Sequence, residues 1–400
     1  MSFPLSFLSR KPSSQKNNYV YRGALQGHFG KILSLGATDD GKLLASGGAD
    51  GTRVWDLETM KEMRGPSSGG IMGATTAIVW IKRDDDPGEC LFYGTQEGYV
   101  VRWRQRAVRI RDGVVLPELT AQQGAPDFEE FFCEQLARPA EITGLAFDSL
   151  SNRLAVCNRD GVVQIHAVDS SMNLRSLYVK QIPNSSPRAI AFGAMQGVER
   201  DVLVFNLYSG QIEIVGKWNV GAYMWVKEIS IVLSKKLTAC SADASIDASK
   251  SSMCLADPIY GVSVHHLEDD GLRKVKSFKV PATKKRTRVR KVSFANQFRE
   301  IVSGSDHGLI YVFDRKDGHT VDVLRIDKVE WAQTVTATDC SGTPTILAAK
   351  SNCEDSEANE IYVWRKRAEK RGVAVTLLAA LAFIYQNVVG GGIVQLRRSV

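Results

Sequence analysis

Three residues early in the chain, His28, Ser46 and Asp50, are of the types that perform nucleophilic catalysis. Many hydrolases use a serine activated by a histidine that a carboxylate orients. The same three side chains can also form a buried hydrogen-bond network that fixes two loops to a strand. Trp55 follows them closely, and its indole N–H must find a hydrogen-bond partner once it is buried.

The histidine pair His265-His266 could suggest a metal site, because imidazole is a common metal ligand. No cysteine or further histidine stands at a ligand spacing from the pair, and neighbouring residues of a strand point to opposite faces. A half-exposed pair on a strand is therefore expected. The chain also lacks a P-loop and the G-x-G-x-x-G, H-E-x-x-H and G-x-S-x-G motifs. The sequence predicts no enzyme, no cofactor and no metal site.

The elements that hold His28, Ser46 and Asp50 are visible in residues 23–57. After Gly27-His28 come a β-prone run, a polar turn at 39–41, an apolar run at 43–45, a tight turn at Asp50-Gly51, and Trp55-Asp56. Asp-Gly supplies the positive φ angles that a two-residue hairpin requires. This order resembles a WD40 repeat, which forms one four-stranded blade of a β-propeller.

The resemblance implies a hydrogen-bonded chain of Trp55, Ser46, His28 and Asp50 that stabilises the blade. It also implies a function in holding protein complexes or short peptides, although a fold says little about function by itself.

Weaker repeats follow the first, and the 400 residues are enough for seven blades and two tails. Strand groups bounded by turns lie at 74–103, 141–169, from 187 onward, 251–280, 288–314 and 331–364. We predict an all-β protein: a seven-bladed WD40 β-propeller over residues 18–367. A disordered tail (residues 1–17) precedes it, and a basic stem with a hydrophobic segment (368–400) follows it.

Three strands must come from outside these groups, and one of them, the first strand of the fifth blade, is expected from residues 217–250. The last group lacks an outer strand, whereas residues 18–25 before the first group are β-prone and unassigned. We expect these residues to complete the last blade and to close the ring. Residues 128–134, FEEFFCE, are expected to supply the outer strand of the second blade.

The stretch 225–243 has apolar runs but no turn signature in register with the blades. It is either a long insertion between strands or sequence foreign to the propeller, such as a translated intron. The sequence leaves open whether it belongs to the propeller.

Net charge is +7, in a chain of ordinary composition with 44% hydrophobic and 24% charged residues. The seven cysteines are scattered without pairing, which indicates reduced thiols in a cytosolic setting. Part of the positive charge gathers in a loop that contains Lys284, Lys285, Arg286, Arg288, Arg290 and Lys291. This segment is either a solvated loop between blades whose last part enters a strand, or a contact for an acidic protein, for anionic lipid or for nuclear import. Nucleic acid is unlikely as a partner, because no aromatic residues alternate with the basic ones.

Residues Gly372–Leu396 contain no charged side chain, and basic residues flank the segment on both sides. A membrane-spanning helix needs about 20 predominantly apolar residues. The alternative is a helix packed on the propeller, which the three glycines at 390–392 favour. We expect a transmembrane helix that anchors a cytosolic propeller, since the larger basic cluster precedes it. The expected location is the endoplasmic reticulum or another endomembrane, with the cytoplasm or nucleus as alternatives.

The function expected from these features is a non-catalytic protein–protein interaction scaffold, with unknown protein partners and the lipid bilayer as contacts. Two alternatives stay open: a nucleotide-exchange factor for a small GTPase, by analogy of architecture, and a soluble nuclear WD40 scaffold.

Overall fold

The computed structural model describes residues 17–66, 72–83, 86–106, 109–111, 114–116, 126–136, 138–196, 199–206, 211–216, 225–230, 243–247, 251–257, 261–268, 271–281, 289–326, 331–351, 354 and 356–368. The chain divides into two units, Met1–Arg365 and Lys366–Val400. Only residues 366–368 of the second unit are among those described.

Seven four-stranded antiparallel sheets, the blades, make up the first unit. Their strands run from the inside outward. Blade 1 consists of β2 (Ile32–Ala37), β3 (Leu43–Gly48), β4 (Gly51–Asp56) and β5 (Lys61–Met63). Blade 2 consists of β6 (Thr75–Arg83), β7 (Asp86–Thr95), β8 (Tyr99–Gln105) and β11 (Phe128–Gln135). Blade 3 consists of β12 (Ile142–Asp148), β13 (Arg153–Asn158), β14 (Val162–Val168) and β15 (Leu174–Gln181). A separate two-stranded sheet pairs β9 (Arg109–Arg111) with β10 (Val114–Leu116).

The remaining blades follow the same plan. Blade 4 consists of β16 (Pro187–Gln196), β17 (Glu199–Asn206), β18 (Gln211–Gly216) and β19 (Trp225–Ser230). Blade 5 consists of β20 (Asp243–Ile246), β21 (Ser252–Asp257), β22 (Gly261–Glu268) and β23 (Gly271–Lys279). Blade 6 consists of β24 (Val292–Ala295), β25 (Glu300–Ser303), β26 (Leu309–Asp314) and β27 (Thr320–Arg325). Blade 7 consists of β28 (Thr334–Cys340), β29 (Thr343–Ala349), β30 (Ala358–Lys366) and β1 (Tyr19–Phe29).

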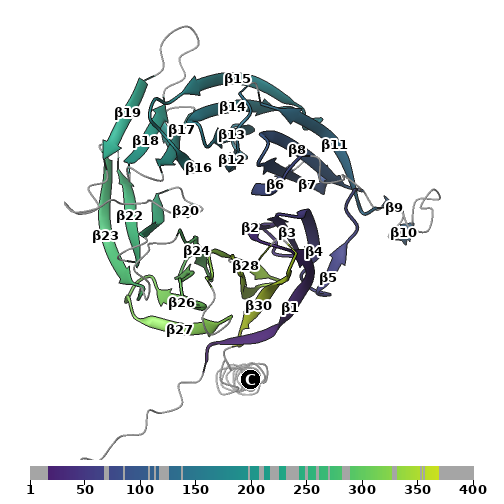
Figure 1. Ribbon diagram of the computed structural model, residues 1–400, viewed down its shortest axis with the longest axis vertical. Coiled ribbons are helices and arrows are strands. Elements are labelled where there is room, and N and C mark those ends of the chain that lie inside the picture. The colour runs from purple at the N-terminus through teal and green to yellow at the C-terminus, as the bar shows by residue number, and fades with distance from the viewer. Residues whose placement is uncertain are drawn as a thin grey trace, which may run out of the picture. The chain divides into compact units, whose positions relative to one another are not determined.

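The innermost strands close into a ring (Figure 1). Each contacts the innermost strand of the next blade, in the order β2, β6, β12, β16, β20, β24, β28 and back to β2. The predicted all-β, seven-bladed propeller is therefore confirmed. Because successive strands of a blade are antiparallel, their turns emerge on two opposite faces. The "a–b face" carries the turns between first and second strands, and the "b–c face" those between second and third strands.

Strand β1 joins the two ends of the propeller, as the sequence predicted. It pairs with β30 as the outer strand of blade 7. It also reaches blade 6, because the Tyr19 hydroxyl donates to Glu300 Oε2 (2.6 Å) and the Tyr19 amide donates to Asp322 Oδ2 (2.8 Å). Tyr19 and Glu300 are both buried. The first described strand is thus bonded to the last blade and to the one before it.

The hydrophobic core is divided among the contacts between blades. The buried apolar side chains among the described residues form seven clusters, and each cluster draws on two adjacent blades. Strands packed on both faces need not alternate apolar and polar residues. This explains why all six residues of β3 are buried.

The hypothesis that 225–243 is foreign to the propeller is wrong for the part that the structure describes. β19 pairs with β18 along its whole length and forms the outer strand of blade 4. Asp243 begins β20, and its Oδ2 accepts a hydrogen bond from the Val292 amide in blade 6 (3.1 Å). Residues 231–242 lie outside the described residues.

The expected outer strand of blade 2 is confirmed, since β11 pairs with β8 across a bulge between Glu130 and Phe132. Within the described residues, no helix has the length and apolar character needed to cross a membrane. The predicted membrane span Gly372–Leu396 lies outside the described residues.

Candidate functional site

Blade 1 brings together the four side chains that the sequence singled out. The Trp55 indole N–H donates to Ser46 Oγ (2.7 Å), and the same hydroxyl lies 2.6 Å from His28 Nε2. His28 Nδ1 lies 2.6 Å from Asp50 Oδ1. Strand β4 supplies the tryptophan, β3 the serine, β1 the histidine, and the tight turn before β4 the aspartate.

The network continues from Asp50 to the surface. Asp50 Oδ2 accepts from the Phe29 amide (3.0 Å) and from Arg53 Nη2 (3.2 Å), while Arg53 Nη1 donates to Glu62 Oε1 (2.7 Å). Burial alone would raise the pKa of Asp50, but the hydrogen bonds from His28 and Phe29 and the charge of Arg53 hold it below its usual range. Asp50 is therefore an acceptor for three neighbours at once.

Ser46 has the hydrogen bonds of a catalytic nucleophile, but a substrate cannot reach its hydroxyl. Its side chain is completely buried, and its hydroxyl is occupied by Trp55 and His28. A nucleophile must lie about 3 Å from the atom that it attacks, which requires an opening to a substrate. The arrangement can fix two loops to a strand, but it offers no site for hydrolysis.

A cleft of about 340 Å³ opens beside this network, between blades 1 and 2 on the b–c face. We call it the blade 1–2 cleft. Arg53 and Glu62 line one side of it, and Tyr93 and Trp103 line another. The two aromatic rings meet edge to face with their centroids 5.3 Å apart. The cleft combines an apolar wall with an ion pair, which is the usual make-up of a small binding site.

Comparison with known families identifies the repeat. Residues 19–56 match the family model described as "WD domain, G-beta repeat" (WD40). This stretch is a WD40 repeat. It begins with β1 in blade 7 and ends with β4 in blade 1, so the repeat in the sequence is offset from the blade in the structure. A search of curated proteins found none that matches the chain.

Blade 3 replaces the tryptophan of the WD40 repeat with His166. Its side chain is 6% exposed, and neither ring nitrogen has a hydrogen-bond partner among the residues that the structure describes. Burial lowers the pKa of His166 to about 4, because a charged imidazolium would lose its hydration there. This histidine is a neutral packing residue.

Blade 6 contains a different network, which the sequence did not reveal. His307 Nδ1 lies 2.7 Å from Asp306 Oδ1, and His307 Nε2 lies 2.9 Å from the Tyr311 hydroxyl. The rings of Tyr311 and Phe313 are stacked with centroids 6.1 Å apart, and Phe313 stands where the WD40 repeat has tryptophan. The spacing of His307, Tyr311 and Phe313 was the feature of the sequence from which this network could have been inferred.

The pair His265-His266 is not half-exposed as predicted, because His265 is buried. His265 Nε2 lies 3.0 Å from Ser263 Oγ, whereas His266 Nδ1 lies 2.8 Å from Ser252 Oγ. Burial, assisted by Lys274, lowers the pKa of His265 to about 4. The two rings have separate serine partners, and the pair does not converge on one point.

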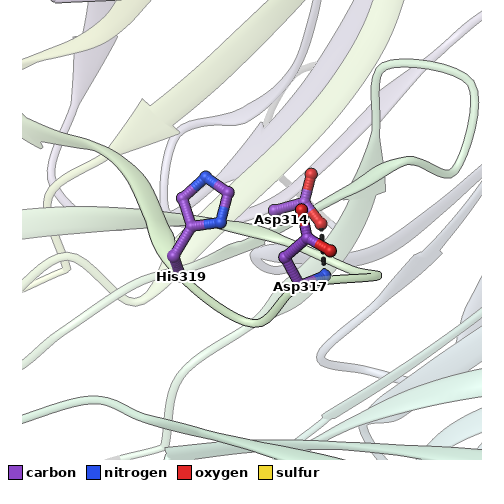
Figure 2. A group of neighbouring side chains, drawn as sticks. All are labelled: Asp314, Asp317 and His319. Atoms are coloured by element: carbon purple, nitrogen blue, oxygen red, sulfur yellow. Dashed lines mark hydrogen bonds between the residues drawn. The ribbon is translucent and has the colours of Figure 1, made fainter.

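Potential metal ligands do approach one another at the turn between β26 and β27. One atom each of Asp314, Asp317 and His319 lies within 4.8 Å of the others. Figure 2 shows the three side chains at this turn. Asp314 Oδ1 already accepts from the Asp317 amide (2.6 Å), and the Asp314 amide donates to the His319 carbonyl (2.9 Å). The geometry of the turn is sufficient to explain why these side chains are neighbours.

The predicted anionic-partner loop needs correction at its end. Arg290 is only 3% exposed, and Lys291 is half-buried with its amide donating to the Gln333 carbonyl (2.8 Å). Burial lowers the pKa of Arg290, and nearby Asp306 and Asp257 act against that effect. These two residues therefore belong to the packing of blade 6. Lys284, Lys285, Arg286 and Arg288 lie outside the described residues. Among the described residues no disulfide joins Cys90, Cys133, Cys157, Cys254 or Cys340.

Proposed function

We propose that this protein is a non-catalytic protein-interaction scaffold. The observation that carries the proposal is the closed ring of seven blades, in which β1 pairs within blade 7 and bonds to blade 6. WD40 propellers are usually non-catalytic scaffolds. A ring whose every blade shares a core with two neighbours holds its turns at fixed positions, which lowers the entropy cost of binding a partner.

The buried hydrogen-bond network supports the same proposal. In blade 1 the residues with catalytic chemistry are used to hold the turn at Asp50-Gly51. Gly51 has φ of 103°, which favours glycine. The network thus fixes a turn on the b–c face beside the blade 1–2 cleft, which is a suitable place for a partner's side chain.

The scaffold proposal is tested by cross-linking the tagged full-length protein in cells and identifying the cross-linked peptides by mass spectrometry. We expect co-purifying proteins whose cross-links fall on the turns of one or both faces. The double variant Arg53→Ala, Glu62→Ala removes the ion pair of the blade 1–2 cleft, and Asp317→Asn on the outer side of blade 6 serves as its control. A protein that purifies alone, without cross-links to any partner, would contradict the proposal.

We further propose that Gly372–Leu396 attaches this scaffold to an endomembrane with the propeller in the cytosol. The support is the uncharged composition of the segment and the basic residues before it. Replacing Leu378 and Leu381 by arginine adds about 2.5–3.5 kcal/mol each to insertion. We expect this variant to be released by alkaline carbonate extraction while the matched valine variant stays in the membrane fraction. Release of the unmodified protein would contradict membrane attachment.

A further inference from the structure

We propose that the cleft where blades 6, 7 and 1 meet on the a–b face binds an arginine side chain presented by a partner protein. We call it the acidic cleft. The inference rests on the proposed scaffold function and names the chemistry of a partner that the scaffold would hold. The three blades are consecutive in the ring, and β28 contacts both β24 and β2 (Figure 1).

The acidic cleft has a volume of about 300 Å³. Its apolar lining includes one alanine from each of three innermost strands: Ala37 at the end of β2, Ala295 at the end of β24 and Ala337 within β28. Asp39 and Asp339 lie on its border, together with the turn after β24. Ligand pockets for cofactors and drug-sized molecules run from about 300 to 1,000 Å³. A cleft at the lower end of that range suits one long side chain better than a nucleotide or another cofactor.

Phe298 is held at the border of the cleft by an unusual backbone. Asn296, Gln297 and Phe298 all have positive φ angles, of 49°, 54° and 63°. Side chains other than glycine rarely adopt this left-handed conformation, and three in succession persist only where the surroundings enforce it. The turn places an aromatic ring at 38% exposure, where a partner can reach it.

The surroundings of this turn enforce its shape from several sides. Asn296 Nδ2 donates to Glu300 Oε1 (3.1 Å), and Arg315 Nη1 donates to the Phe298 carbonyl (3.3 Å). The rings of Phe294 and Phe298 meet edge to face at 5.8 Å, and the Arg315 guanidinium lies 5.0 Å from the centre of the Phe294 ring. Glu300 is the residue that also accepts from the Tyr19 hydroxyl, so the turn and the closure of the ring share one carboxylate.

The charges of the cleft select a cation. Both ionisable residues that line it are carboxylates, and no lysine, arginine or histidine is among the described residues of its lining. Asp39 is exposed, and no hydrogen bond or ion pair to its carboxylate is found within the part of the chain that the structure describes. Basic groups near the cleft have carboxylate partners of their own: the Lys82 ammonium lies 3.2 Å from Glu89, and the Arg315 guanidinium beside Phe294 lies 3.4 Å from Asp247 Oδ2. The Asp39 carboxylate is therefore available to a cationic ligand.

Arginine fits these features better than lysine. A planar guanidinium can donate two parallel hydrogen bonds to one carboxylate such as that of Asp39 and stack on an aromatic ring at the same time, whereas an ammonium is a compact point charge. A cation that lies over the exposed face of the Phe298 ring would add a cation–π contact, which arginine forms more often than lysine. The methylene groups of the arginine would lie on the alanine lining.

The test uses a displayed library of random peptides selected on the full-length protein, followed by fluorescence polarisation with the selected peptides. We expect selected peptides to share one arginine, and replacement of that arginine by the neutral isostere citrulline to weaken binding about tenfold, the usual effect of a charge-assisted hydrogen bond. Asp39→Asn and Phe298→Ala should each weaken binding similarly. Asp317→Asn, which removes an exposed carboxylate elsewhere in blade 6, should leave it unchanged.

Three results would overturn the proposal: selected peptides without a shared arginine, equal binding of the citrulline peptide, or binding that Asp39→Asn and Phe298→Ala do not alter. Circular dichroism and thermal unfolding of each variant exclude misfolding as the cause of lost binding. If partners still cross-link to the wild-type protein while the peptides ignore the acidic cleft, the scaffold function stands and only the assignment of this cleft fails.

Discussion

At the scale of single residues, His28 connects the two halves of the blade 1 network. It is 1% exposed and lies between Ser46 Oγ and Asp50 Oδ1. Removing it leaves both partners without their hydrogen bond to imidazole. The penalty for a buried polar group that loses its partner exceeds the net value of the bond itself.

The variant His28→Ala should therefore lower the free energy of unfolding by about 1–3 kcal/mol. Urea unfolding followed by tryptophan fluorescence measures the change. The control is His319→Ala, since His319 is exposed on a turn of blade 6. Equal midpoints for His28→Ala and the unmodified protein would mean that the network does not stabilise the blade.

His166 makes stability depend on pH in a predictable direction. Its pKa is about 4 in the folded protein and about 6.5 in an unfolded chain. The unfolded state therefore binds the proton more readily, and acid favours unfolding. Stability from this group is complete above about pH 6.5, falls by about 1.4 kcal/mol per pH unit below it, and levels off near pH 4. His265 adds to the slope in the same range.

We expect His166→Phe to reduce this slope between pH 6.5 and 4, because phenylalanine carries no titrating group. Phe313 already stands at the equivalent position of blade 6, so the side chain suits this site of a blade. Urea midpoints measured at several pH values provide the comparison. The same slope in both proteins would show that His166 is not buried as a neutral base.

The residues of the blade 1 network could be predicted from sequence because their types and order match a repeat. The blade 6 network of Asp306, His307 and Tyr311 could not be predicted, since a tyrosine hydroxyl takes the place of serine and the order of the partners along the chain differs. Arg290 was expected in an exposed loop because basic residues precede it, but it is buried against blade 6. A run of like charges says nothing about which member turns inward.

At the scale of strands, β1 is the element that closes the ring. Burial, followed by the nearby carboxylate of Glu300, raises the pKa of Tyr19 far above its usual range. The hydroxyl therefore stays protonated and donates to Glu300 Oε2. Hydrogen bonds of this kind, to a charged and buried acceptor, are among the stronger ones.

Tyr19→Phe removes only that hydroxyl, and we expect it to cost about 1.5–3 kcal/mol of stability. Tyr21→Phe is the matched control, because Tyr21 lies on the same strand with its side chain 51% exposed. Thermal unfolding of the two variants side by side measures the difference. Two equally stable variants would show that the hydrogen bond from the Tyr19 hydroxyl to Glu300 contributes little.

Strand β1 was predictable because blade 7 lacked an outer strand and residues 18–25 were left over. Strand β19 could not be predicted in this way, although it is the outer strand of blade 4 just as β1 is the outer strand of blade 7. It is only six residues long, and the stretch 225–243 that contains it has no turn signature in register with the blades. An outer strand pairs on one side only, so its sequence carries a weaker pattern than that of an inner strand.

At the scale of the whole propeller, stability and function depend on the same closure. Each core cluster belongs to two blades, so a blade released from one neighbour loses part of its core. Tyr19 and Leu25 of β1 are members of the clusters on the two sides of blade 7. Opening the ring at β1 would therefore expose apolar surface on both sides and loosen the turns that we propose hold partners.

The central claim is that β1 is an integral strand of a closed ring, and hydrogen–deuterium exchange on the full-length protein tests it most directly. If the ring is closed, amides of Tyr19–Phe29 that bond to β30 exchange as slowly as those of β29 in the middle of the same blade. The variant Tyr19→Phe should speed exchange in β1 more than in β12, which lies in the distant blade 3. Rapid exchange throughout β1 in the unmodified protein, with β29 still protected, would contradict the closed ring.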